Sequence, residues 1–203
     1  MLQHSTDILA VDFVLLPVDQ EVEDIVFLNK NLSQPANHQI ILSRTGNQPH
    51  LSLLMGGLPV AGLPEAEEKL HALARSFESF YLKINKTVLR NDCVSLNVEK
   101  NQKLQLLHQT LIKEFYDLKK TDITGEMFVA DSVISNGSIK YINSYWQQNI
   151  QEDFWPHITL GYGKLGENAR IPGVIGFDKI GLYHLGNHCT CSKNIFTITL
   201  TTR

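Results

Sequence analysis

The hydrophobic residues of this chain recur with two different periods, and the segments that carry them alternate along the sequence. Runs rich in β-branched or aromatic residues, and runs of alternating apolar and polar residues, indicate strands, whereas apolar residues spaced three and four apart indicate amphipathic helices. The predicted strands are Ala10 to Pro17, Val94 to Val98, Ile175 to Leu185 and Ile195 to Leu200. The predicted helices are a short one that begins at Asp19 and three long ones at about 64–80, Leu104 to Leu118 and Ile139 to Ile150, the last after the turn signal Asn136-Gly137. Strands interleaved with helices predict an α+β (α/β-like) fold.

Composition narrows the class of protein. The chain has 203 residues, with 18 basic and 21 acidic side chains, a net charge of −3 and a pI near 6.2. This mild acidity argues against a surface that binds long DNA, because such surfaces are rich in Lys and Arg. It leaves room for a small anionic ligand that is held by a few local donors.

The cysteines and the apolar segments bear on the compartment. Three cysteines do not make a secreted disulfide framework. The first seven residues carry no Lys or Arg, unlike a signal peptide, and Asp12 interrupts the apolar run from Ile8 to Pro17. No segment approaches the roughly 20 apolar residues that span a bilayer. We therefore expect a reduced, cytoplasmic protein that has no membrane partner.

One short pattern occurs twice, about half the chain apart. The two copies are Pro49-His50-Leu51-Ser52-Leu53 and Pro156-His157-Ile158-Thr159-Leu160. Residues i and i+2 of a strand point to the same face. Each copy therefore predicts a strand with one aliphatic face and one face that carries a histidine and a hydroxyl. Duplicated halves commonly pack about a pseudo-two-fold axis, which would bring His50, Ser52, His157 and Thr159 together.

These four side chains suit displacement at a phosphodiester. Histidine has an ordinary pKa of about 6.5, so one imidazole can be neutral while the other is protonated. The neutral one can accept a proton from an attacking water or hydroxyl, and the protonated one can donate to a leaving oxygen. The hydroxyls of Ser52 and Thr159 can donate hydrogen bonds to the developing anion. This chemistry needs no metal or other cofactor.

At these residues the sequence resembles the two-histidine (2H) phosphoesterase superfamily, which includes 2′,3′-cyclic nucleotide phosphodiesterases, 2′-5′ RNA ligase-like proteins and 2′-5′ oligoadenylate phosphodiesterases. The resemblance implies a single bilobal domain over residues 1–203. In that domain, two antiparallel sheets with outer helices are related by a pseudo-two-fold axis, and one motif strand per lobe lines a central cleft. It also implies that His50 and His157 are catalytic and that Ser52 and Thr159 bind phosphate. The chain departs from the common pattern in having Ser52 in place of Thr, and Gly161-Tyr162-Gly163-Lys164 where ligase-like members often have arginine.

Residues beside the second motif are further candidates for substrate binding. Trp155 precedes the motif and could stack on a base, or could simply pack against the domain. Tyr162 follows the motif and could contact substrate. By strand alternation, however, it shares the face of Ile158 and Leu160, which favours the core.

A second cluster of candidate ligands lies near the end of the chain. It consists of His184, His188, Cys189 and Cys191. Zinc sites typically combine Cys-x₂₋₄-Cys pairs from separated segments, so we interpret this cluster as a hairpin with incidental thiols and predict no metal site.

The sequence thus predicts a monomeric, metal-independent phosphodiesterase that hydrolyses a 2′,3′-cyclic phosphate on a nucleotide or an RNA end, with a role in RNA processing. Two alternatives remain open. One is cleavage of 2′-5′ oligoadenylate, and the other is a module that binds a nucleotide or an RNA end without turnover.

Overall fold

The computed structural model describes residues 7–35, 39–129, 133–167 and 169–202. Most of the amino-terminal segment used above to judge a targeting signal, residues 1–6, lies outside this range. The strands are β1 (Ile8–Pro17), β2 (Leu51–Pro59), β3 (Phe80–Arg90), β4 (Cys93–Val98), β5 (His157–Tyr162), β6 (Val174–Leu185) and β7 (Cys191–Thr199). The α-helices are α1 (Asp19–Lys30), α2 (Leu63–Ser76), α3 (Gln102–Glu114) and α4 (Asn136–Gln148).

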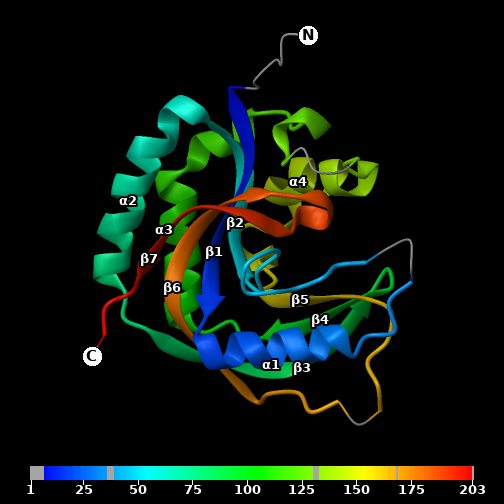
Figure 1. Ribbon diagram of the computed structural model, residues 1–203. Coiled ribbons are helices and arrows are strands. Elements are labelled where there is room, and N and C mark those ends of the chain that lie inside the picture. Colours follow the sequence, from blue (N-terminus) through cyan, green and yellow to red (C-terminus); the bar gives the residue numbers. More distant parts are fainter. Residues whose placement is uncertain (1–6, 36–38, 130–132, 168, 203) are drawn as a thin grey trace.

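The seven strands are all paired antiparallel, in the order β1-β2-β5-β4-β3-β6-β7, with a further pairing between β1 and β6. They form two lobes. In the first lobe β1 lies between β2 and β6, and in the second β4 lies between β5 and β3. Strand β6 belongs to both lobes, because Val174–Phe177 pairs with β3 and later residues pair with β1. Figure 1 shows β1 and β2 running upright and β4 and β5 running across.

This architecture confirms the predicted α+β fold of two antiparallel halves with outer helices. Helix α2 packs on β6 and β7, α3 and α4 contact β2, and α1 contacts β5 (Figure 1). One buried hydrophobic cluster runs through both lobes and includes Phe13, Leu51, Leu96, Ile158 and Phe177. Among the described residues, none of the helices combines the length and apolar character that crossing a bilayer would require.

The structure corrects the boundaries of several predicted elements. The helix predicted at 64–80 ends at Ser76, because Phe77 is extended and Phe80 begins β3, a strand that the sequence analysis missed. Both phenylalanines are buried, so their apolar spacing continued the helical pattern by coincidence. The predicted helix to Leu118 ends at Glu114 and is followed by a 3-10 helix, Tyr116–Lys120. Asn136-Gly137 is no separate turn; it forms the first turn of α4, which Ser135 caps.

Candidate active site

The two motif strands meet at the junction of the lobes. Leu51 of β2 pairs directly with Ile158 of β5, and both side chains are fully buried. Continuing this antiparallel register by one residue places His50 opposite Thr159 and Ser52 opposite His157. The four polar side chains are partly buried and alternate with fully buried aliphatic ones. The predicted imidazole–hydroxyl face is therefore present in both copies, and the fold brings the two faces together.

Both imidazoles are oriented by a hydrogen bond to the backbone carbonyl two residues earlier. The Nδ1 atom of His50 lies 2.7 Å from the carbonyl oxygen of Gln48, and that of His157 lies 2.9 Å from the carbonyl oxygen of Trp155. A carbonyl only accepts, so Nδ1 donates in each case and Nε2 of the neutral ring carries the lone pair. Pro49 and Pro156 occupy the intervening positions, just before the strands, where proline removes no ladder hydrogen bond.

Burial favours the neutral form of both histidines. It lowers the pKa of His50 to about 4, partly offset by the hydrogen bond to Gln48 and reinforced by the nearby His157. Burial also lowers the pKa of His157, and the positive charge of Arg90 lowers it further. The positions of His50 and His157 beside the paired Leu51 and Ile158 place the two rings on one face of adjacent strands. Each ring can therefore accept a proton at Nε2, and protonation of one disfavours protonation of the other.

The two hydroxyls have different surroundings. Ser52 Oγ donates a 2.6 Å hydrogen bond to Oδ2 of Asp12, a fully buried carboxyl group on β1. The same Asp12 oxygen lies 3.7 Å from His50 Nε2, and Asp12 Oδ1 has no hydrogen-bond partner. Burial raises the pKa of Asp12 well above its usual range, and the Ser52 hydrogen bond opposes this shift. Asp12 thus adds a buried carboxyl group to the histidine and hydroxyl of the first motif.

Aromatic and cationic side chains surround the second motif. The Trp155 ring stacks on His157 with 4.1 Å between ring centroids, and its Nε1 donates to Asn97 Oδ1. The Arg90 guanidinium lies 4.0 Å from the Trp155 ring centroid. The Trp155 ring therefore has two close neighbours, His157 and Arg90. A substrate-binding role for Trp155 stays a prediction.

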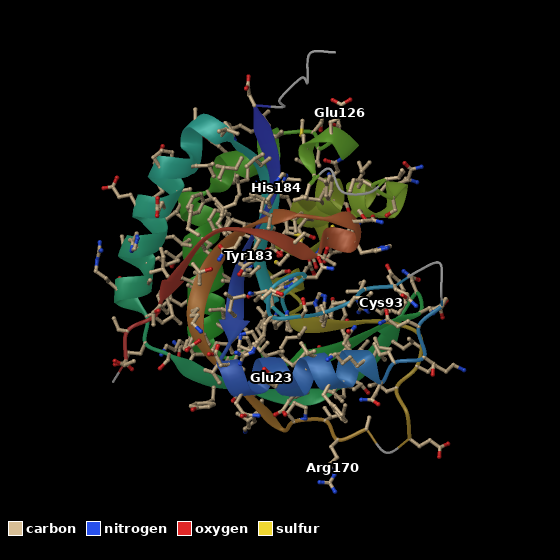
Figure 2. The ribbon with its side chains drawn as sticks, viewed as in Figure 1. Glu23, Cys93, Glu126, Arg170, Tyr183 and His184 are labelled. Atoms are coloured by element: carbon tan, nitrogen blue, oxygen red, sulfur yellow. The ribbon has the colours of Figure 1, made fainter. Side chains whose placement is uncertain are left out.

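Tyr162 is half-buried and packs against the core, as alternation favoured, but a bulge changes the face of the strand on which it lies. Between β4 and β5 the register shifts, so that Ser95 is opposite Thr159 but Val94 is opposite Gly161 and Cys93 is opposite Tyr162. Gly161 has a φ of +141°, a conformation that disfavours other residues. The bulge leaves Leu160 unpaired and turns Tyr162 to the face of Thr159. Cys93, labelled in Figure 2, marks this end of β4. Tyr162 Oη lies 3.2 Å from His188 Nδ1.

The carboxyl-terminal cluster does not converge on one point. His184 Nε2 lies 2.8 Å from the Met127 carbonyl, and Cys189 Sγ faces the Ser138 carbonyl at 3.7 Å. Cys191 instead points toward Asp12 and His50. Of the labelled residues in Figure 2, Tyr183 and His184 mark β6, which separates β7 from β1.

Several residues around the motifs could not be recognised from the motifs alone. Asp12 interrupts an apolar run, and a lone carboxylate in a strand that is otherwise buried is itself a signal. Arg90 and Tyr141 carry no recognisable pattern. Burial chiefly raises the pKa of Tyr141, the charges of Cys189 and Asp12 raise it further, and the charge of Arg90 opposes this shift.

Two antiparallel lobes, each with one His-x-Ser or His-x-Thr strand, define the class of two-histidine phosphoesterases. A family model of the 2′-5′ RNA ligase superfamily matches residues 41–171, which contain both motifs. The chain belongs to this superfamily. No curated protein sequence matches the chain.

Solved structures share the fold of this chain. TT0787 of Thermus thermophilus superposes with a TM-score of 0.62 at 17% identity, covering 96% of this chain and 100% of that one. LigT of E. coli complexed with 3′-AMP gives 0.53 at 17% identity, and LigT complexed with ATP gives 0.56 at 15% identity. Both LigT matches cover 97% of this chain and all of LigT. At these identities the likeness establishes a shared fold.

Proposed function

We propose that this protein is a metal-independent phosphodiesterase that hydrolyses a 2′,3′-cyclic phosphate on a nucleotide or an RNA end. The observation that carries the proposal is the pairing of Leu51 with Ile158, which sets His50 and His157 on one face with Nδ1 of each fixed by a carbonyl. Two imidazoles whose free Nε2 atoms face one site can hold a base and an acid on opposite sides of a phosphorus atom.

In the proposed reaction, water attacks the cyclic phosphate while one Nε2 accepts its proton. The bond from phosphorus to one ribose oxygen breaks, and the other histidine, as imidazolium, gives its Nε2 proton to that oxygen. The hydroxyl of Thr159, opposite His50 in the register, donates to a non-bridging oxygen as negative charge develops. The product is a phosphomonoester, and the two histidines have exchanged protonation states.

The substrate is expected to be a nucleotide because of what surrounds the second motif. Arg90 supplies a cation and Tyr162 a phenol on the side of His157. LigT, which shares the fold, has been crystallised with 3′-AMP, with phosphate and with ATP. Local donors of this kind fit a short anionic ligand and do not require the basic surface that long nucleic acids need.

The experiment is hydrolysis of a panel of 2′,3′-cyclic mononucleotides, cyclic-phosphate RNA ends and 2′-5′ oligoadenylate, all in EDTA. Wild type should convert the cyclic phosphates, whereas His50→Ala and His157→Ala should not. His71→Ala is the matched control, because His71 is an exposed histidine on α2. Preferential cleavage of 2′-5′ oligoadenylate would replace the proposed substrate by that alternative. Tight nucleotide binding without turnover of any substrate would mean that the protein is a binding module.

A further inference from the structure

Three side chains with different ligand chemistry converge beneath the first motif. They are Asp12 of β1, His50 just before β2, and Cys191 at the start of β7, and their ligand atoms all lie within 4.8 Å of one another. The backbone ties the segments of His50 and Cys191 together, since Gln48 N donates to the Cys191 carbonyl at 3.2 Å. The Gln48 carbonyl also accepts the Nδ1 hydrogen bond from His50. The segments on either side of the cluster are therefore held together before any ligand binds.

Each of the three groups has an atom available for coordination. His50 Nδ1 is occupied by a carbonyl, which fixes the tautomer with its lone pair on Nε2, as is usual for histidines that bind metals. Asp12 Oδ1 is buried and has no hydrogen-bond partner. Cys191 is a free thiol and is fully buried. The other carboxyl oxygen, Oδ2, accepts the Ser52 hydrogen bond and lies 3.7 Å from His50 Nε2. The two side chains thus approach one another about as closely as two ligands of one ion with bonds of about 2.0–2.2 Å.

The ligand set selects the kind of metal. Imidazole, thiolate and carboxylate together suit Zn²⁺, whereas Mg²⁺ and Ca²⁺ prefer oxygen ligands. Three protein ligands would leave a fourth position for water. The His50 side chain is 11% exposed while Asp12 is fully buried, so an ion would enter past the imidazole.

We propose that Asp12, His50 and Cys191 form an inhibitory site for Zn²⁺. On binding, the Cys191 thiol and the Asp12 carboxyl group each release any proton they carry to solvent, so that a thiolate and a carboxylate coordinate the ion. Zinc takes the Nε2 lone pair of His50. That lone pair is the one needed for proton transfer, so zinc and catalysis exclude each other at His50. The inhibitory part of this inference rests on the proposed function, whereas zinc binding itself does not.

Binding is tested first, on the full chain freed of metal by EDTA and then dialysed. Titration with Zn²⁺ against a chromogenic chelator should give one ion per chain for the wild type. Cys191→Ser should weaken binding by more than the roughly 10–100-fold that loss of an outer-shell partner costs. Cys189→Ser is the matched control, because Cys189 is a buried thiol two positions away that faces the Ser138 carbonyl. Mg²⁺ should not compete.

The absorption spectrum of bound Co²⁺ tests the site in the wild-type protein alone, whether or not a variant folds. Co²⁺ bound to the wild type should give the absorption of a thiolate-ligated, four-coordinate ion, and Cys191→Ala should lack its thiolate component. The site is overturned if wild type binds no zinc, if Cys191→Ser binds it as tightly as wild type, or if bound cobalt shows no thiolate ligand.

Inhibition is tested on the same proteins with a 2′,3′-cyclic nucleotide. One equivalent of Zn²⁺ should suppress turnover by wild type and by Cys189→Ser, EDTA should restore it, and Cys191→Ser should keep its activity at that zinc concentration. Zinc binding that depends on Cys191 but leaves turnover unchanged would overturn the inhibitory role. If wild type turns over no substrate on the panel, the proposed function fails, and the titration and the cobalt spectrum still decide the site.

Discussion

The two copies of the motif share the same hydrogen bond from histidine to the backbone but have different neighbours. In both, the histidine Nδ1 donates to the carbonyl two residues earlier, and the hydroxyl two residues later lies on the same face. Around the first copy lie a buried carboxyl group and a buried thiol, Asp12 and Cys191. Around the second lie an indole and a guanidinium, Trp155 and Arg90. The two copies thus orient their imidazoles alike, while their surroundings differ.

The difference indicates that the surroundings of the two histidines have different roles. The groups beside His50, Asp12 and Cys191, are fully buried, so they can position the histidine but cannot contact solvent. Groups beside His157 include the exposed Arg90 and the half-buried Tyr162, which can meet a substrate. Both environments lower the pKa of their histidine, chiefly by burial. The lobes therefore differ in what they contact rather than in the protonation state they favour.

The largest expected effect tests whether the copies are equivalent in chemistry. His50→Ala and His157→Ala should each lower kcat/KM by roughly 10²–10⁴-fold, the usual contribution of a general acid or base. The double variant should lose less than the product of the two, because the residues act as a unit. Steady-state kinetics on a cyclic nucleotide, with His71→Ala as control, measures both. Wild-type rates in either single variant would show that only one copy is catalytic.

The hydroxyls should behave less alike than the histidines. Thr159→Ala should lower kcat/KM by roughly 10²-fold, as loss of one oxyanion donor does. Ser52→Ala should lower it only about tenfold, because the Ser52 proton is already donated to Asp12, whereas that of Thr159 can serve the phosphate.

In thermal stability the order of the two hydroxyl variants should be the reverse: Ser52→Ala should be destabilised more than Thr159→Ala. Removing the Ser52 hydroxyl leaves the buried Asp12 carboxyl without its donor, at a cost of about 1–3 kcal/mol, so Tm falls by several degrees. Thermal unfolding of both variants, with Ser52→Thr as the conservative control, checks this. A larger rate loss for Ser52→Ala than for Thr159→Ala would show that Ser52 exchanges Asp12 for substrate.

The sequence was informative where one strand dictates the geometry and uninformative where several elements meet. Alternation of His50 with Leu51, and of His157 with Ile158, defined the polar face because period two follows from the backbone alone. The same rule gave the wrong face for Tyr162, although the ring does pack against the core. The face depends on a bulge at Leu160 and Gly161, which is set by the neighbouring strand β4. The position of Cys191 beside the first motif could not be seen locally. Its neighbours come from β1 and from the residue before β2, and only the closure of the sheet brings them together.

The value of kcat/KM should increase toward acidic pH. This dependence tests whether both histidines are predominantly neutral near pH 7. The mechanism needs one imidazole and one imidazolium, and both pKa values lie below the ordinary 6.5. As pH falls from about 8 toward about 6, the singly protonated pair becomes more populated, so kcat/KM should rise by up to about tenfold per unit. Its maximum should lie below about pH 6.5. A pH–rate profile in EDTA measures this, and a maximum above about pH 7.5 would contradict it.

The smallest effect concerns the substrate side of the second copy. Arg90→Ala should raise KM by about 2–5-fold, the scale of an exposed cation–π or phosphate contact, and leave kcat nearly unchanged. Arg90→Lys should fall between, because an ammonium keeps the charge but not the planar stacking on Trp155. Loss of the cation should also move the pH–rate profile slightly upward, since Arg90 lowers the pKa of His157. Arg75→Ala, an exposed arginine on α2, is the control for general loss of charge. If Arg90→Ala instead lowered kcat with KM unchanged, Arg90 would act by positioning Trp155 and His157. The surroundings of both motif copies would then serve to orient the histidine.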